Sequence, residues 1–239
     1  MNAILLAAGF GSRLLPLTET TPKCLVKIGN KFLIDLWIEK LFDLGIKKIL
    51  INTHYLKNVV EDHICKLGAY KEGRIVLSYE KELLGTAGTL INNIDFFDDQ
   101  DGILLHADNY TRDNLKQFLK FHLNQSNDSY ITMMTFRTNN PEKSGIVEID
   151  ENNVVKNFYE KRKGIKGNLA NSAIYIISSD ILNSFRSIKA RDFSTEIIPK
   201  YLNKIKVYET NNYFIDIGDL KSLKKANKFN SLYEQQKEK

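Results

Sequence analysis

The chain has 239 residues, of which 43% are hydrophobic and 26% are charged, an ordinary balance for a globular protein. It has no apolar run near the roughly 20 residues of a membrane span, no secretory signal and only two cysteines, so we expect a cytoplasmic protein with no membrane partner. The net charge of +5, from 34 basic and 29 acidic residues, is too small an excess to indicate a nucleic-acid partner.

The first predicted element is an apolar strand that runs into a glycine-rich loop. Residues 3–8 indicate a buried parallel strand, and Gly9 and Gly11 follow at once, ahead of Arg13. Glycines permit positive φ angles and close approach of a ligand, and consecutive free N–H groups form an anion-binding concavity. Together with Lys23, which lies beyond a proline-flanked loop, the stretch indicates a polyphosphate site. A Gly-x-Gly pair is also compatible with an ordinary strand–turn–helix, and neither the dinucleotide nor the Walker spacing is present.

Strands and helices alternate through the first half of the chain. Helices are predicted over 32–44, over 56–67 and from residue 85, and further strands over 48–53, 74–80 and 102–108. Such alternation is typical of an α/β fold with a mostly parallel sheet flanked by helices. Ligands of these sheets bind beyond the carboxyl ends of the strands. Because Gly9, Glu80 and Asp108 all follow strand ends, we predict that three segments converge on one crevice.

The second half has more strands and fewer helices. We predict a strand over 130–136, a hairpin over 145–155, strands over 158–161, 169–177, 207–209 and 213–217, a helix capped by Ser179, a helical turn over 194–199 and a closing helix capped by Asp219. No linker or internal repeat separates the halves. We therefore predict one domain over 1–239, with an α/β core over 1–140 and an integral second half over 141–239.

One string in the opening loop is specific in both order and spacing: Leu6-Ala-Ala-Gly-Phe-Gly-Ser-Arg-Leu14, then Pro16-Leu-Thr18 and Pro22-Lys23. It resembles the signature of the sugar-1-phosphate nucleotidyltransferases, and the later segment Leu84-Gly-Thr-Ala-Gly88 resembles the short mannose-1-phosphate guanylyltransferase-like forms. The resemblance implies a Rossmann-like, GT-A-like fold, with the nucleotide bound by residues 1–140 and the sugar phosphate by residues 141–239. It also implies that the nucleoside triphosphate contacts Leu6, Ala8, Gly9, Gly11 and Ser12, that Arg13 holds the outer phosphates, and that Lys23 lies beside the reacting phosphate.

Two aspartates are placed to hold a metal ion. Asp108 ends a buried strand in His106-Ala-Asp-Asn109, and Asp216 lies between apolar neighbours. A carboxylate in such a place needs a partner, and a structural capping role is an alternative for each. Mg²⁺ binds one or two carboxylates together with phosphates and water. The resemblance implies that Asp108 and Asp216 are paired Mg²⁺ ligands, and Asn109 is expected to contact substrate.

The pair Glu160-Lys161 resembles the Glu-Lys element of the same family. There the lysine binds the phosphate of the sugar 1-phosphate, and the glutamate accepts a sugar hydroxyl. This chain has Arg162 where the family often has proline, which puts the loop geometry in doubt, and Lys161 alone is also compatible with a solvated charge run. Gly145 and Asn171 resemble the residues that contact the sugar.

The segment from Glu80 to Gly88 resembles the one that recognises the base, with Gly85 and Thr86 inside it. An ionised carboxylate only accepts hydrogen bonds. Guanine offers two adjacent donors, whereas uracil and thymine offer one N–H between two carbonyls. Glu80 therefore favours GTP. His106-Ala-Asp-Asn-Tyr110 is similar to the phosphocholine cytidylyltransferase branch, which keeps CTP open.

From these features we predict an Mg²⁺-dependent enzyme that transfers a nucleoside monophosphate, with GTP favoured, to a sugar 1-phosphate and releases pyrophosphate. Uridylyl, thymidylyl or cytidylyl transfer to another phosphate, including a phosphocholine-like acceptor, is the alternative. A non-catalytic nucleotide-binding regulatory module is the alternative of another class. The residues leave the sugar, the anomer and the oligomeric state open, with a homodimer as one arrangement.

Overall fold

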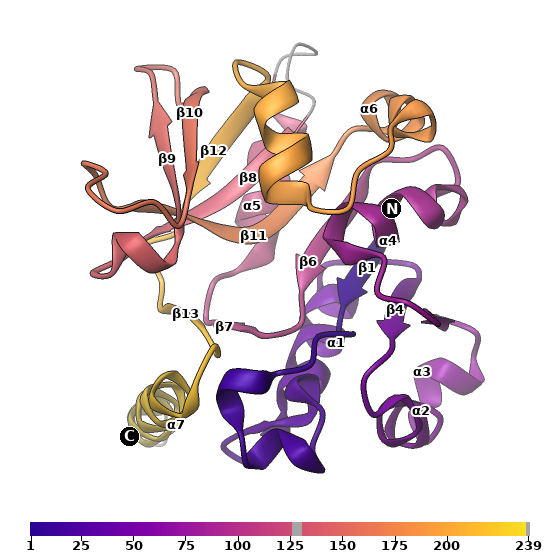
Figure 1. The fold of residues 1–239 in the computed structure, drawn as a ribbon. Coiled ribbons are helices and arrows are strands. Elements are labelled where there is room, and N and C mark those ends of the chain that lie inside the picture. Colours follow the sequence, from indigo (N-terminus) through magenta and orange to yellow (C-terminus); the bar gives the residue numbers. More distant parts are fainter. Residues whose placement is uncertain (126–130, 238–239) are drawn as a thin grey trace. The chain divides into compact units, whose positions relative to one another are not determined.

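The computed structural model describes residues 1–125 and 131–237 (Figure 1). These residues form two compact units, each built from three separate segments. Unit 1 comprises Met1–Ile4, Leu84–Leu105 and Asp113–Asn212, and unit 2 comprises Leu5–Leu83, His106–Arg112 and Tyr213–Lys239. Within the described ranges, every helix is too short or too polar to cross a bilayer.

The strands are β1 (Asn2–Leu6), β2 (Lys27–Ile28), β3 (Lys31–Phe32), β4 (Ile49–Thr53), β5 (Ile75–Tyr79), β6 (Gly102–His106), β7 (Asn109–Thr111), β8 (Ile131–Arg137), β9 (Gly145–Ile149), β10 (Val155–Glu160), β11 (Leu169–Ile177), β12 (Ile205–Glu209) and β13 (Phe214–Asp216). The α-helices are α1 (Leu33–Asp43), α2 (Lys57–Ile64), α3 (Gly68–Lys71), α4 (Gly85–Asn92), α5 (Leu115–Leu123), α6 (Ser179–Ser184) and α7 (Leu220–Lys237).

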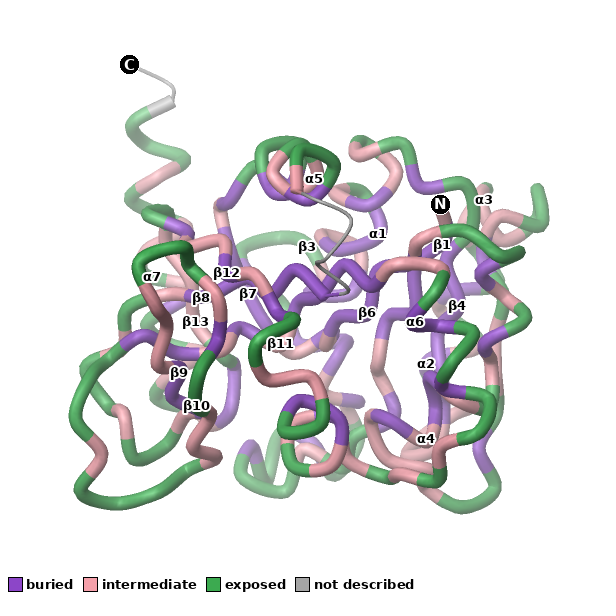
Figure 2. Tube along the Cα trace, turned by 90° about the horizontal axis from the view of Figure 1, so that it is seen from above, coloured by how far each residue is buried: buried purple, intermediate pink, exposed green. Residues whose placement is uncertain are grey.

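The strand pairing confirms the predicted α/β class. The largest sheet has the order β10-β9-β11-β6-β1-β4-β5, and β8 and β12 extend from β11 off this path. Strand β4 is parallel to β5, and β12 to β8, whereas β11 runs antiparallel to β6, β8 and β9. The sheet is thus mixed, and helices flank it (Figure 1). Strands β4 and β6 are almost wholly buried, as their apolar sequences predict (Figure 2).

In unit 2, helix α1 supplies one side of the core. Its apolar residues recur at helical spacing, as predicted over 32–44, and the buried ones are Leu33, Ile34, Trp37, Ile38 and Leu41. Trp37 is 2% exposed, and its indole N–H donates to the Asn109 carbonyl at 2.7 Å. A buried indole N–H needs such an acceptor, and Trp37 is the core residue that its position predicts.

A second cluster of unit 2 packs the last segment of the chain against the glycine-rich loop. Leu14 of that loop lies in one buried cluster with Ile217 and Ala226. Strand β13 pairs antiparallel with β7, and Asp219 caps α7 by accepting the Ser222 N–H at 2.7 Å. Residues from both ends of the chain therefore hold the loop together.

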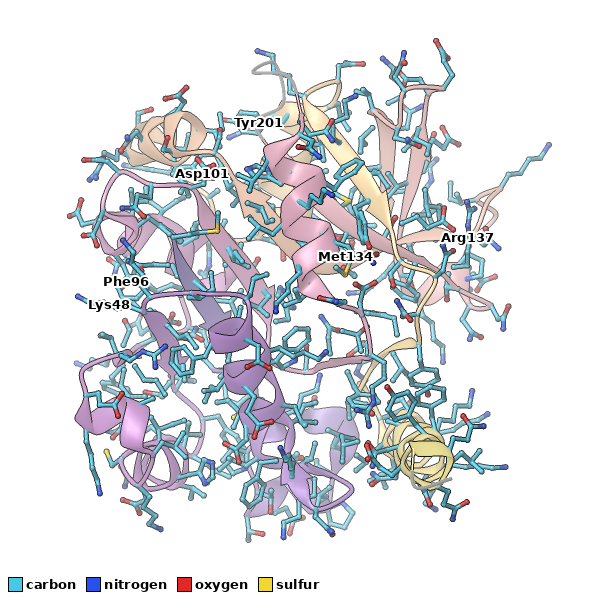
Figure 3. All side chains as sticks on the ribbon, turned by 180° about the vertical axis from the view of Figure 1, so that it is seen from behind. Lys48, Phe96, Asp101, Met134, Arg137 and Tyr201 are labelled. Atoms are coloured by element: carbon cyan, nitrogen blue, oxygen red, sulfur yellow. The ribbon has the colours of Figure 1, made fainter. Side chains whose placement is uncertain are left out.

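In unit 1, β11 is the central strand, with the predicted bounds. It pairs with β8, whose last residue is Arg137 (labelled in Figure 3). The Arg137 guanidinium forms a bidentate ion pair with the Glu209 carboxylate. The predicted residue Tyr130 lies outside the described residues. A bulge interrupts the β11–β8 register between Asn171 and Tyr175, and Ala173 within it has a φ of +56°.

A buried polar group also lies in unit 1. The His122 ring, 7% exposed, contacts the Thr132 hydroxyl at 2.7 Å and the Asp101 carboxylate at 3.3 Å (Asp101 is labelled in Figure 3). The hydrogen bond to His122 lowers the pKa of Asp101. These contacts tie α5 to β8 and to the residue that precedes β6.

Two sequence predictions are wrong in detail. The strand predicted over 158–161 is the continuation of the second hairpin strand, because β10 runs unbroken from Val155 to Glu160 opposite β9. Ser179 is the first residue of α6 rather than its cap; Ser178 occupies the cap position, and its side chain makes no capping hydrogen bond. In both cases tertiary contacts, and not the local sequence pattern, decide which element the polar residues belong to.

Replacing Ala173 by glycine should stabilise the fold. A non-glycine residue in the left-handed region costs roughly 1–2 kcal/mol, whereas glycine loses about 0.5–1 kcal/mol more backbone entropy. We therefore expect Ala173→Gly to raise the free energy of unfolding by about 0.5 kcal/mol, measured by urea denaturation. Ala170→Gly, at a buried position of β11 outside the bulge, should lower it by about 1 kcal/mol or more. Equal losses in the two variants would contradict the strain at Ala173.

Candidate functional site

The loop that follows β1 has the backbone the glycines predict. Gly11 has a φ of +66°, and a Cβ there would lie 2.9 Å from Thr18 Cγ2, so no larger residue fits. The Thr18 hydroxyl donates to the Gly11 carbonyl at 2.9 Å, and Leu14 N–H donates to the same oxygen at 2.8 Å. Gly9 and Ser12 are exposed, whereas Ala8 is buried. Hydrogen bonds to the Gly11 carbonyl thus hold the loop, while Gly9 and Ser12 are exposed to solvent.

Two cations of unit 2 lie beside this loop. Lys23 forms an ion pair with Asp108, and its Nζ lies 3.8 Å from Asp216 Oδ1. The guanidinium of Arg13 lies against Gly218, where a Cβ would be 3.2 Å from Arg13 Nη2 and 3.1 Å from Asp216 Oδ2. Lys23, Arg13 and the two carboxylates therefore meet in one place.

The pairing of β13 with β7 sets the two aspartates side by side. Asp216 is opposite Asn109 in the register, and the Ile217 N–H donates to the Asp108 carbonyl at 2.9 Å. Burial opposes the charge of Asp108, but Lys23 and His106 together lower its pKa below the ordinary value. Burial, and then the charge of Asp108, raise the pKa of Asp216. The positive charges of Lys23 and Arg13 lower the pKa of Asp216, but they do not offset its burial and the charge of Asp108.

These residues fit a hard divalent cation. Among the described residues, no group of three or more His, Cys, Asp or Glu side chains is placed to hold a metal ion. Two carboxylates that converge on one cation leave most of the coordination to phosphate and water, which is the habit of Mg²⁺. The raised pKa of Asp216 is what a second cation beside it would relieve.

Glu80 follows β5 and is 4% exposed. Its N–H donates to the Thr53 carbonyl at 2.9 Å, and its Oε1 accepts from the Asn52 amide at 2.9 Å. His54 Nδ1 lies 2.8 Å from the Glu80 carbonyl oxygen. Sequence reasoning did not single out Asn52, although a polar residue inside the apolar strand Ile49–Thr53 signals a buried hydrogen-bonded group.

Gly85 and Thr86 open α4 in unit 1. Gly85 has a φ of +81°, and a Cβ there would collide with the Arg191 carbonyl oxygen. That oxygen accepts from the Ala87 N–H at 2.9 Å, and the Thr86 hydroxyl accepts from the Phe193 N–H at 2.7 Å. The segment 191–193 therefore holds the start of α4, a contact that no local sequence pattern predicts.

The residues predicted to bind a sugar phosphate also lie in unit 1. Gly145 is opposite Glu160 in the β9–β10 register, and a Cβ at Gly145 would lie 2.7 Å from Glu160 Oε2. Lys161 Nζ lies 3.0 Å from Glu160 Oε1; its side chain is 64% exposed, and its φ is +46°. A cation held outward by a left-handed residue at a strand end is suited to meet an anion.

Asn171 is held by the bulge of β11. Its Oδ1 accepts from the Ala173 N–H at 2.9 Å, and its Nδ2 donates to the Tyr175 hydroxyl at 2.6 Å. Burial raises the pKa of Tyr175, against hydrogen bonds from Asn171 and Ser194. Sequence reasoning missed Tyr175, because the alternation of a regular strand does not bring residues i and i+4 into contact.

The predicted residues are thus distributed over both units. Unit 2 brings together the loop from Leu6 to Arg13 with Lys23, Asp108, Asn109 and Asp216, and links Ala7 of the same loop to Glu80 through Asn52. Unit 1 holds Gly145, Glu160, Lys161 and Asn171 on adjacent strands, and Gly85 and Thr86 on α4. The predicted convergence of the segments after β1, β5 and β6 is found inside unit 2.

Comparison with known proteins identifies the family. The model of the nucleotidyl transferase family matches residues 2–231. The chain belongs to this family. A mannose-1-phosphate guanylyltransferase catalytic subunit beta of Drosophila melanogaster is 31% identical over 225 residues, which cover 92% of this chain and 60% of that protein. A glucose-1-phosphate adenylyltransferase of Clostridium acetobutylicum is 32% identical over 249 residues, covering 94% of this chain and 66% of that protein.

Solved structures with a similar fold superpose on this chain. HddC from Yersinia pseudotuberculosis superposes with a TM-score of 0.79 at 26% identity, covering 95% of this chain and 98% of that one. A second structure of HddC, complexed with GMP-PN, superposes with a TM-score of 0.78. This nucleotidyl transferase chain spans about three fifths of the length of the guanylyltransferase it matches.

Removing the charge of Lys23 should make stability depend on pH in a specific way. Asp108 contributes stability above its ordinary pKa, which is lost as pH falls through the lowered value. In Lys23→Met the carboxylate stays partly buried without its partner, so its pKa rises. We expect a deficit of about 2 kcal/mol in the free energy of unfolding at pH 7.5, shrinking toward pH 4 as Asp108 takes up a proton.

Urea denaturation at the two pH values measures this deficit. Lys31→Met is the matched control, since it removes an exposed pair with Glu39 and should cost about 0.5 kcal/mol or less at either pH. A Lys23→Met deficit of equal size at pH 7.5 and pH 4 would show that the pair with Asp108 is not its source.

Proposed function

We propose that the protein transfers a nucleoside monophosphate from a nucleoside triphosphate, with GTP favoured, to a sugar 1-phosphate. The products are pyrophosphate and a nucleoside diphosphate sugar of the GDP-mannose or GDP-heptose kind. The convergence of Lys23, Arg13, Asp108 and Asp216 beside the glycine-rich loop is the observation that carries this proposal. The guanylyltransferase and adenylyltransferase relatives support the same class of reaction.

The chemistry requires a single displacement. A phosphate oxygen of the acceptor forms a bond to the α-phosphorus of the triphosphate, the bond from that phosphorus to the bridging oxygen breaks, and its electron pair leaves with pyrophosphate. The acceptor phosphate is already ionised at neutral pH, so no side chain has to remove a proton. Positioning and neutralisation of charge are what the protein must supply.

The residues of unit 2 suit the triphosphate. The loop N–H groups from Gly9 to Ser12 and the guanidinium of Arg13 hold the outer phosphates and the departing pyrophosphate. Lys23 places its ammonium beside the α-phosphate and stabilises the charge that builds on it. Asp108 and Asp216 would hold Mg²⁺, which when bound supplies further positive charge to the phosphates.

The residues of unit 1 suit the acceptor. Lys161 holds the acceptor phosphate, while Glu160, Asn171 and the exposed backbone at Gly145 take the sugar hydroxyls. The division of labour between residues 1–140 and 141–239 is part of this proposal. Asp216 qualifies it, because it serves the nucleotide although it lies in the second range.

Guanine is favoured on the chemistry of Glu80. Its carboxylate can accept from the ring N–H and the amino group of guanine together, a pair of donors that uracil, thymine and cytosine do not offer. The guanylyltransferase relative and the HddC complex with GMP-PN support this choice. We place the protein in the cytoplasm, a proposal supported by two unpaired cysteines, Cys24 buried and Cys65 exposed; the homodimer stays a prediction.

One plate of assays tests the proposed function. Pyrophosphate release from GTP, ATP, CTP and UTP, each crossed with a panel of sugar 1-phosphates and phosphocholine in the presence of Mg²⁺, should be fastest with GTP and a hexose or heptose 1-phosphate. Faster release from CTP with phosphocholine would select the cytidylyl alternative. Binding of nucleotides without turnover in any well would select the regulatory module.

Asp108→Asn should lower pyrophosphate release by about 100-fold or more while the fold persists, because the variant keeps the shape but loses a charged metal ligand. The thermal unfolding midpoint checks the fold. Asp101→Asn is the matched control; it removes a partly buried carboxylate that contacts His122 and should change stability without changing turnover. Near-normal turnover in Asp108→Asn would refute the metal assignment.

A further inference from the structure

Asn52 is a buried amide with a partner on each side. It lies inside the apolar strand β4 and is 3% exposed. Its Oδ1 accepts from the Ala7 N–H at 2.7 Å, and its Nδ2 donates to Glu80 Oε1 at 2.9 Å. A buried amide without hydrogen-bond partners is costly, so these two bonds hold the side chain in place.

The two partners fix which way the amide points. A backbone N–H only donates and an ionised carboxylate only accepts, so the oxygen must face Ala7 and the nitrogen must face Glu80. Ala7 is the first residue after β1, where the phosphate-binding loop begins, and Glu80 is the first residue after β5. The Glu80 N–H is itself fixed on the neighbouring Thr53 carbonyl at 2.9 Å.

One side chain therefore ties the start of the phosphate loop to the carboxylate that faces the base. We propose that Asn52 is the positioning residue for base selection: it sets the orientation of the Glu80 carboxylate relative to the loop that holds the triphosphate. This inference rests on the proposed function. A free carboxylate could rotate about its side-chain bonds and accept from many donors, whereas one anchored through Oε1 presents a fixed pair of acceptor positions.

The pair GTP and ITP measures this orientation. ITP differs from GTP only by lacking the 2-amino group, so the ratio of their kcat/KM values reports one hydrogen bond to the base. A bond to a charged acceptor contributes about 1.5–3 kcal/mol, so the wild-type ratio should be about 10- to 100-fold. In Asn52→Leu, which keeps the size but loses both bonds, the ratio should fall to within about 3-fold of unity.

The control is another buried asparagine. Asn2 is 4% exposed, and its Nδ2 donates to the Phe96 carbonyl at 2.6 Å in unit 1. Asn2→Leu should lower the unfolding midpoint but leave the GTP to ITP ratio at its wild-type value. A merely structural role of Asn52 would lower kcat/KM for GTP and ITP by the same factor and leave the ratio unchanged.

A second variant covers the case in which Asn52→Leu does not fold. Asn52→Asp keeps the acceptor for Ala7 but places a carboxylate oxygen against Glu80, and two such groups share a proton rather than both ionise. A protonated Glu80 is no longer a pure acceptor. The ratio should therefore fall in this variant too, and should vary with pH between 6 and 8, below the range in which the N1–H of either base ionises.

The outcomes separate the inference from the function on which it rests. A folded Asn52 variant with the wild-type ratio overturns the role of Asn52 and leaves the guanylyl transfer intact. A wild-type protein that does not distinguish GTP from ITP overturns both Glu80 as the base reader and Asn52 as its positioner. If the wild type releases no pyrophosphate, the proposed transfer fails, and the ratio of Kd values for GTP and ITP, measured by titration calorimetry, decides on Asn52 by the same criteria.

Discussion

The ammonium of Lys23 is the interaction on which the candidate nucleotide site depends. It lies between two carboxylates that would otherwise repel each other. The pKa of Asp108 is lowered and that of Asp216 is raised, so Lys23 stabilises the two negative charges unequally. The raised pKa of Asp216 shows that further positive charge would stabilise its carboxylate. Under the proposed function, the divalent cation that accompanies the triphosphate would supply positive charge beside these carboxylates. Charge balance is therefore the main feature of the cluster that Lys23 forms with Asp108 and Asp216.

The other functional residues are held by buried hydrogen bonds or by backbone conformation. Trp37 fixes the Asn109 carbonyl, and Asn52 fixes both the start of the loop and Glu80. On the acceptor side, Lys161 and Ala173 occupy the left-handed region beside the predicted sugar-contacting residues. Hydrogen bonds in the protein interior are little weakened by salt, and strained backbone is retained only where its surroundings enforce it. Hydrogen bonds thus position the residues of the proposed nucleotide site, and backbone conformation positions those of the proposed acceptor site.

Much of this could be predicted from sequence, for reasons that particular residues illustrate. The strands that contain Asn52 and Leu104 are apolar enough to be predicted from sequence. The helical spacing of Trp37 and its apolar neighbours predicts α1. The Gly9–Lys23 string carries its own signature, which the family assignment over residues 2–231 confirms. Sequence analysis did not identify Asn52, because its partners Ala7 and Glu80 are distant in sequence. It did not identify Tyr175, because only the bulge of β11 brings its hydroxyl to Asn171. The hold of Arg191 on Gly85 joins residues more than a hundred positions apart, and no local pattern encodes it.

The pairing of β13 with β7 has a consequence for how the site comes into being on the ribosome. Synthesis delivers the glycine-rich loop, Lys23 and Asp108 in the first half of the chain, but Asp216 and the helix that packs against Leu14 arrive only near residue 230. A nascent chain of 200 residues carries Lys23 and Asp108 but lacks Asp216, the second carboxylate beside this lysine. Under the proposed function, nucleotide affinity should therefore appear only after this last segment has been synthesised and has packed against the loop.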